Sequence, residues 1–142
     1  VENRTLSPSD FGFHNALNRA GGTVFLDFEY FGWDDPAKTV SDFLLHPAMP
    51  LPEHLRRRFV DDFLTEFHDD GQLARRLPAV YPLFGLKWCL ILLNEFVPES
   101  LGRREFAGGD MDRETLQFQQ LSKARDMLNR VAKEYRNFPY YG

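Results

Sequence analysis

The later part of the chain repeats apolar residues at helical spacing. Segment 52–67 has an apolar residue at every fourth position, and segment 112–135 shows a similar stripe, so each predicts a helix with one buried face. The stripes consist of Leu55, Phe59, Phe63 and Phe67 in the first segment, and of Leu116, Leu121, Ala124, Leu128, Val131 and Tyr135 in the second. A third helix is predicted over 73–97, where Pro78 and Pro82 are expected to divide the early part.

A shorter helix is predicted over Pro36–Leu45. Asp35 is the expected N-cap, and Pro36 suits the first helical position because its missing N–H would be unpaired there anyway. Pro47 ends the segment, since the residue before a proline is disfavoured in the helical region. The tail 136–142 is expected to fray, or to pack only through its Tyr and Phe rings.

The start of the chain has the pattern of loops and short strands. Residues 1–9 contain Pro8 and are predicted to be a loop, and residues 14–20 to be extended or weakly helical. Gly21-Gly22 is a turn signal, and 23–30 is predicted to be a strand. Alternate residues of a strand share a face, so Asp27 and Glu29 are expected to leave it on the same side.

These elements predict a mainly α protein with a small β-hairpin, an α+β fold in a single domain over 1–142. Within it, residues 1–35 form the hairpin part and residues 36–142 a helical subdomain. The length of 142 residues is enough for one domain with its own core, and an apolar content of 43% argues against disorder.

Charge and cysteine content exclude several classes. The formal net charge of −4 argues against a nucleic-acid binder that is held through phosphate contacts. The single Cys89 excludes an internal disulfide and suits a reducing compartment, so we expect a cytoplasmic protein. No signal peptide is recognised. The most apolar run, 84–96, is shorter than the roughly 20 residues of a membrane span, so we expect a buried helix and no membrane contact.

The candidate chemistry lies near the start of the chain. Asp10 is followed by Asn15, and Asp27 stands in the apolar segment after the Gly-Gly turn. A hairpin of this size can bring the second carboxylate back to the loop that carries the first. ATP-dependent phosphoryl transfer uses such groups: one carboxylate aligns a substrate hydroxyl, while an amide and a second carboxylate hold Mg²⁺. An Asp-x-x-x-x-Asn spacing alone is a weak pattern.

With their context, these residues resemble the aminoglycoside phosphotransferase and choline kinase family, the small-molecule branch of the protein-kinase-like fold. Segment 9–15 resembles the catalytic loop of that family, 26–30 its metal-binding strand end, and 34–43 the following turn and helix. The resemblance implies a C-terminal lobe of that fold, a small-molecule hydroxyl substrate, and ATP and magnesium as cofactors. It makes Asp10 the catalytic residue, Asn15 and Asp27 the cofactor and metal ligands, and Asp42 a structural acid that supports the loop.

Two departures from the family pattern leave a second hypothesis open. Pro8 stands where the family has a His that braces the loop. The chain also has no Gly-x-Gly-x-x-Gly, because Gly21-Gly22 and Gly108-Gly109 are too short to cradle phosphates. We therefore expect a piece of a longer kinase that lacks the N-terminal nucleotide-binding lobe and is inactive alone; the first residue, Val1, points the same way. The alternative is a pseudokinase or a non-catalytic helical interaction module.

Several acidic residues admit two interpretations. Glu29 could contact a substrate amine or a second metal ion, or be an outward acid on an edge strand. Asp34 and Asp35 could join Asp27 and Glu29 in recognising a cationic substrate such as an amino alcohol or aminosugar. The plainer interpretation, a capped turn with Lys38 as its partner, is favoured.

The remaining aromatic, basic and histidine residues are assigned mainly structural roles. Trp33 and Tyr30 could enclose a quaternary amine, although core packing is favoured. His14 lies beside Asn15 and could influence the site. The other histidines lack metal-ligand spacing and are expected at the surface or at caps; they are His46, His54 and His68. The Arg pairs and triplet at 56–58, 75–76 and 103–104 are expected on solvated helix faces.

Overall fold

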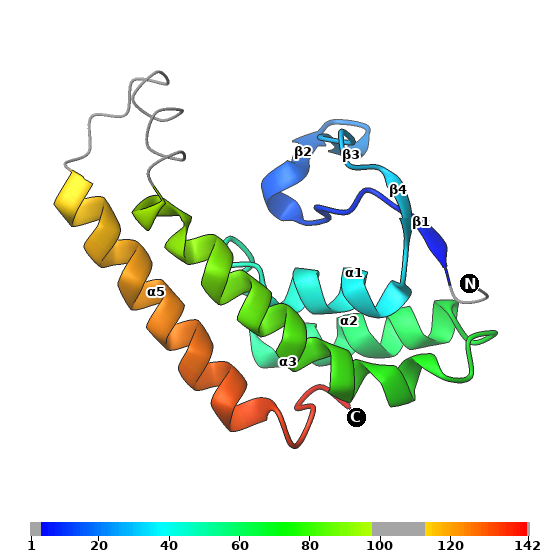
Figure 1. Cartoon of the computed structure of the whole chain (residues 1–142). Coiled ribbons are helices and arrows are strands. Elements are labelled where there is room, and N and C mark those ends of the chain that lie inside the picture. Colours follow the sequence, from blue (N-terminus) through cyan, green and yellow to red (C-terminus); the bar gives the residue numbers. More distant parts are fainter. Residues whose placement is uncertain (1–3, 98–112, 142) are drawn as a thin grey trace.

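The computed structural model describes residues 4–97 and 113–141. Most of these residues are helical, and two small antiparallel sheets lie over helix α1 (Figure 1). The long helices are α1 (Pro36–Leu45), α2 (Glu53–Glu66), α3 (Leu73–Leu92) and α5 (Arg113–Glu134). The predicted mainly α protein with a small β part is confirmed at this level. Asp112, the predicted start of the last helix, lies outside the described residues.

Two strand pairs frame the start of the chain. Strand β1 (Thr5–Ser7) pairs with β4 (Gly32–Asp34), and β2 (Ala16–Arg19) pairs with β3 (Gly22–Phe25). A 3-10 turn, η1 (Phe13–Asn15), precedes the hairpin. The prediction of a loop over residues 1–9 is wrong for 5–7, because a strand from later in the chain supplies the hydrogen-bond partners that a local pattern cannot show.

The predicted strand over 23–30 ends early, at Phe25. Asp27 has a φ of 60°, in the left-handed region, and a pleated strand cannot continue through that conformation. Glu29 then lies in a turn before β4. The expectation that Asp27 and Glu29 leave one strand on the same side is therefore wrong.

Local capping sets the bounds of α1 as predicted. The Asp35 carboxylate accepts a hydrogen bond from the Ala37 N–H at 2.8 Å, and Pro36 is the first helical residue. The helix ends at Leu45, one residue before the His46-Pro47 pair. Its inward face is buried, so α1 forms a platform under the β part.

A ladder of phenylalanine rings joins the β part to the helices. Phe11 lies 5.1 Å from Phe25 and 5.6 Å from Phe43 of α1, measured between ring centroids. The ladder continues from Phe43 to Phe59 of α2 at 4.0 Å, and along the predicted α2 stripe through Phe63. Rings at such separations attract one another beyond their burial, so the loop that carries Phe11 is anchored to the core.

Helix α3 is the central packing element and runs unbroken through Pro78 and Pro82, against the prediction that they divide it. A proline removes the N–H that would bond the carbonyl four residues earlier, which for Pro78 is that of Ala74. The Tyr141 hydroxyl donates to this carbonyl and replaces the missing bond. The 3-10 segment η2 (Leu93–Phe96) then extends α3.

The helix α3 and segment η2 together, Leu73–Phe96, are long and apolar enough to cross a membrane by length and composition alone. The stretch is longer than the run 84–96 that the sequence singled out, and 28% of its most apolar window is buried in this structure. The helix packs on α1 and α5, where Gly85 approaches Val131 closely. The expectation of a buried helix is wrong for its outer side, where Leu86 and Leu90 are exposed.

The tail packs rather than frays. Phe138 and Tyr140 are buried, and both rings contact the buried Tyr81 of α3. Arg130 of α5 donates to the Tyr140 hydroxyl at 2.6 Å and to the Leu44 carbonyl at 3.2 Å. The tail is therefore held against α3 by its rings, and against α5 and α2 by hydrogen bonds to Tyr140.

Candidate functional site

The loop before Asp10 is held by a set of hydroxyl contacts. The Ser7 side-chain oxygen is 3.2 Å from the Thr39 hydroxyl of α1 and accepts from the Ser9 N–H at 3.0 Å. Lys38 of α1 donates to the Ser9 hydroxyl at 2.8 Å. Ser9 itself has a φ of 66°. Within the described residues, Ser9 and Asp27 are the non-glycine residues with positive φ, and such costly conformations concentrate at functional sites.

Asp10 and Asn15 are brought together by η1. The Asn15 side-chain amide donates to the Asp10 backbone carbonyl at 3.0 Å and to its carboxylate at 3.3 Å. These bonds use the amide nitrogen and leave the amide oxygen of Asn15 as an acceptor. The two residues that the motif paired are thus one hydrogen-bonded unit.

The hairpin returns the chain to this unit. Register pairs Ala16 with Phe25, and the Leu26 N–H donates to the Asn15 carbonyl at 2.8 Å. Asp27 is the next residue. Its side chain is exposed and makes no hydrogen bond or ion pair with any of residues 4–97 or 113–141. Glu29 is also exposed, in the turn before β4.

Asp42 lies at the centre of a polar cluster on α1 and α3. Its carboxylate accepts from Lys87 at 2.6 Å and from the Trp88 indole at 2.9 Å, and lies 3.8 Å from the Lys38 ammonium. Lys38 in turn holds Ser9, so the link from Asp42 to the loop is indirect.

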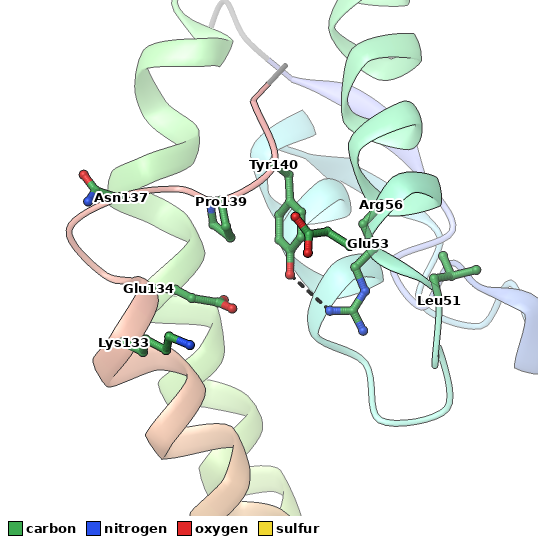
Figure 2. Close-up of a pocket in the computed structure, with 8 residues that line it drawn as sticks. All are labelled: Leu51, Glu53, Arg56, Lys133, Glu134, Asn137, Pro139 and Tyr140. Carbon is green, nitrogen blue, oxygen red and sulfur yellow. Dashed lines mark hydrogen bonds between the residues drawn. The ribbon is translucent and has the colours of Figure 1, made fainter.

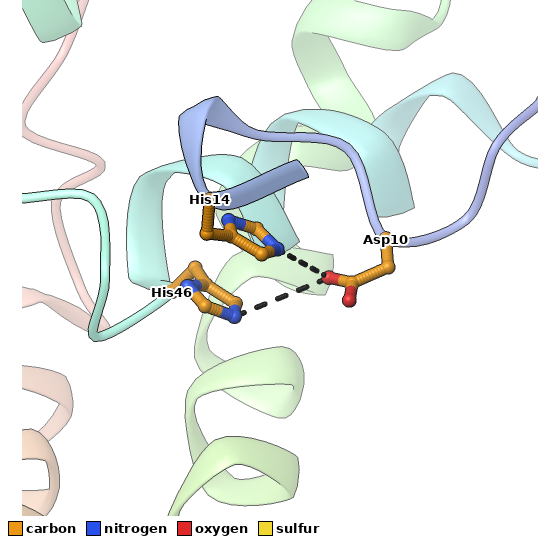
Figure 3. A group of neighbouring side chains, drawn as sticks. All are labelled: Asp10, His14 and His46. Atoms are coloured by element: carbon orange, nitrogen blue, oxygen red, sulfur yellow. Dashed lines mark hydrogen bonds and ion pairs between the residues drawn. The ribbon is translucent and has the colours of Figure 1, made fainter. Parts of the chain in front are cut away.

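Two histidines face Asp10 (Figure 3). His14 Nε2 lies 3.1 Å from Asp10 Oδ1, and His46 Nε2 lies 4.0 Å from the same oxygen. The two rings stack, with centroids 3.9 Å apart and planes 1° from parallel. Burial lowers the pKa of His46, and the neighbouring His14 lowers it further, while Asp10 acts in the opposite direction.

His46 is a site residue that sequence reasoning missed. It is the C-cap of α1, so the expectation of a surface or cap position is confirmed for its backbone, but its side chain is largely buried and stacked on His14. No signal near Asp10 could have found it, because α1 lies between the two in the chain. His54 and His68 are exposed, as expected.

A cavity of about 300 Å³ opens beside Asp10. It is lined by Ser9, Asp10, Tyr30, Lys38, Asp42, Lys87, Trp88 and Ile91. The walls therefore combine two carboxylates, two ammonium groups and two aromatic rings. Tyr30 and Trp33 are 70% and 64% exposed, so the expectation that they pack in the core is wrong.

The acids before α1 are already engaged. Asp34 accepts from Lys38 at 2.7 Å, and Asp35 caps α1 and binds Arg76 at 2.9 Å. The plainer interpretation of a capped turn with Lys38 as partner is confirmed. Arg76 also binds Asp70 at 2.6 Å, so this residue of a basic cluster is a structural link and not a solvated charge. Residues 103–104 lie outside the described residues.

A second cavity, of about 480 Å³, lies where α2 begins and α5 ends (Figure 2). Arg56 donates there to the Tyr140 hydroxyl at 3.1 Å. This cavity shares no residue with the one beside Asp10. Although it is larger, its walls contain no residue of the loop, so we take the smaller cavity, which Ser9 and Asp10 line, as the candidate acceptor site; Asn15 and Asp27 line neither cavity.

Comparison of the chain with protein-family models, with curated proteins and with solved structures found no match. The function must therefore be argued from the geometry of the loop, the hairpin and α1.

Proposed function

We propose that this chain carries the catalytic loop and metal-binding residues of an ATP- and Mg²⁺-dependent phosphotransferase. Its acceptor is the hydroxyl of a small molecule such as an aminosugar or amino alcohol. One observation carries the proposal: Asn15 is hydrogen-bonded to Asp10, and the backbone N–H of Leu26, the residue before Asp27, is hydrogen-bonded to the Asn15 carbonyl. The resemblance to the C-terminal lobe of the kinase-like fold includes the same three residues.

The three side chains divide the work. Asp10 borders the cavity, where its carboxylate can align an acceptor hydroxyl; positioning is the main requirement, because phosphoryl transfer passes through a loose transition state. The Asn15 amide oxygen and the Asp27 carboxylate are hard oxygen donors that suit Mg²⁺. When bound, the ion would neutralise charge that develops on the transferred phosphoryl group.

A nucleotide-binding lobe must come from elsewhere. The described residues contain no glycine-rich phosphate cradle. They do expose many large apolar side chains over 6–33, including Phe13, Phe28, Phe31 and Trp33, which is the kind of surface that a neighbouring domain covers. We therefore propose that the chain acts as one lobe of a longer cytoplasmic kinase, with little turnover by itself.

The recognition of an amine would depend on few groups. Asp34 and Asp35 are bound to Lys38 and Arg76, and Asp27 is assigned to the metal ion, which leaves Glu29 as the remaining exposed acid of this group. Glu29 is thus the candidate for contact with a substrate amine or a second metal ion. The ammonium groups of the cavity face Asp42, so they balance its charge.

A pseudokinase is the second candidate, favoured by Pro8 at the position where the family has its bracing His. The two proposals differ in their response to Mg²⁺ and nucleotide. A ligand that binds the folded state must raise its melting temperature, so a thermal-shift titration of the complete protein separates binding from its absence.

The decisive test is turnover of ATP with a panel of hydroxyl acceptors by the complete protein. Asp10→Asn and Asp27→Ala should each lower the rate by at least about a hundredfold without unfolding the protein. Asp61→Asn, on the exposed face of α2, is the matched control and should leave the rate unchanged. Unchanged turnover in either site variant would overturn the role assigned to that residue.

A further inference from the structure

The two histidines beside Asp10 point in the same direction. Their rings are parallel and stacked, so both Nε2 atoms face the Asp10 carboxylate (Figure 3). A carboxylate at neutral pH can only accept, so His14 Nε2 must carry the proton of the 3.1 Å hydrogen bond. His46, at 4.0 Å, is beyond direct hydrogen-bond reach, and its contact is with the His14 ring.

Two histidines and a carboxylate also suggest a transition-metal site, and these ligand atoms lie within 4.8 Å of one another. Two observations oppose it. Parallel rings aim their lone pairs side by side and not at a common ion. In addition, His46 Nδ1 accepts a hydrogen bond from the Ala48 N–H at 3.1 Å, which places the proton of a neutral ring on Nε2, the atom that a metal would need.

We infer that His14 and His46 are positioning residues for Asp10: His14 donates to its carboxylate, and His46 holds the His14 ring in place. The inference rests on the proposed function in one respect, that Asp10 is the group that aligns the acceptor hydroxyl. Asn15 binds Oδ2 and His14 binds Oδ1, so both carboxylate oxygens are oriented.

The surroundings are built to hold this pair. At Gly12, a Cβ atom would lie only 2.6 Å from His14 Cε1, so the absence of a side chain there makes room for the ring. The Trp88 and His46 rings are nearly perpendicular, with centroids 4.6 Å apart, and the Trp88 indole donates a hydrogen bond to Asp42. The helical platform of α1 and α3 thus reaches Asp10 through stacked rings.

This chain of contacts gives Asp42 a second indirect route to the loop, besides the one through Lys38. A change at Asp42 should alter the position of the Asp10 side chain through Trp88 and His46, although Asp42 makes no direct bond to the loop. Side chains locked by their own neighbours are what a positioned catalytic group needs.

Nuclear magnetic resonance of the isotope-labelled 142-residue chain, near neutral pH, tests the contacts without any assay of activity. We expect a proton on the Nε2 atom of both rings, and a His14 Hε2 proton that exchanges slowly with water. Asp10→Ala should speed this exchange by about tenfold or more, and so should His46→Ala, while His68→Ala, at an exposed site, should not. Unchanged exchange in His46→Ala, or a proton on His46 Nδ1, would overturn the inference.

Turnover of the complete protein then separates the inference from the proposed function. His46→Ala should lower kcat by about tenfold or more with the KM for nucleotide unchanged. His14→Gln, which retains a donor, should keep more activity than His14→Ala. If Asp10→Asn retains full turnover, the proposed function fails. If Asp10→Asn is inactive but His46→Ala retains the wild-type kcat, the inference fails and the proposed function stands.

Discussion

Adding one methyl group at Gly85 tests the packing of α3 directly. An ideal Cβ atom there would lie 2.2 Å from Val131 Cγ2 of α5 and 3.7 Å from Leu45 Cδ2 of α1. Ordinary contact begins at 3.4 Å, so the Gly85→Ala methyl requires a shift of more than an ångström between two packed helices. A shift of a few tenths would not relieve the overlap.

The net effect combines two opposing contributions. Overpacking a tight contact costs about 1–3 kcal/mol, and an overlap this severe belongs at the upper end. Alanine is better than glycine in a helix interior by about 1 kcal/mol, which offsets part of that cost. We therefore expect Gly85→Ala to lower the free energy of unfolding by about 1–2 kcal/mol.

A double-mutant cycle identifies the source of the cost. Val131→Ala removes the clashing methyl groups and alone should cost about 1–2 kcal/mol. In that background the new Cβ meets the Cβ of residue 131 at 3.5 Å and Leu45 Cδ2 at 3.7 Å, which are both ordinary contacts, so Gly85→Ala should be neutral or stabilising. The two changes should thus couple by about 2 kcal/mol.

Urea unfolding followed by circular dichroism measures all four proteins of the cycle, with the slope checked for constancy. Gly85→Ala alone would refute the packing if it raised stability by about 1 kcal/mol, the propensity effect alone. An equal cost in both backgrounds would show that Val131 is not what the new methyl meets.

Three further predictions concern polar contacts. Asp35→Ala should destabilise by about 1–2 kcal/mol in urea unfolding, because the α1 cap and a bond to Arg76 are both lost, while Asp35→Asn should retain much of the cap. The hydrogen bond from Arg76 lowers the pKa of Asp70. The ionised carboxylate therefore stabilises the folded state above the pKa of the unfolded chain, and this contribution is lost as the pH falls through the lower, folded-state pKa. Asp70→Asn should cost about 1 kcal/mol at neutral pH and nothing in strong acid. Burial raises the pKa of Tyr81, so thermal melts should show stability falling as pH rises above about 10, and less steeply in Tyr81→Phe.

Helix α1 was predictable because its limits are encoded locally. Asp35 and Pro36 start the helix and Pro47 follows its end, so neighbouring residues contain the whole signal. The unbroken course of α3 was not predictable, since the carbonyl left free by Pro78 is satisfied by Tyr141 from the far end of the chain. The early end of β3 depends on the left-handed backbone of Asp27, which alternation of apolar residues does not reveal.

In the candidate site, too, the contacts between residues close in sequence were predictable, and those between distant residues were not. Asp10 and Asn15 are close in sequence, so their spacing was enough to predict that they lie together, as their hydrogen bonds show. His46 comes from beyond α1 and reaches Asp10 only through tertiary packing. Asp42 was expected to support the loop, and its links pass through Lys38 and Trp88, contacts that no linear motif contains.

The central claim is that Asp10, Asn15 and Asp27 form one metal-dependent site. Titration of the labelled 142-residue chain with Mn²⁺, a paramagnetic ion that accepts the oxygen ligands of Mg²⁺, tests it most directly. We predict that the first resonances to broaden are those of the Asn15 side chain and of the backbone at Asp10 and Asp27, and that Asp27→Ala removes the effect. Broadening centred elsewhere, or unchanged in Asp27→Ala, would contradict the account.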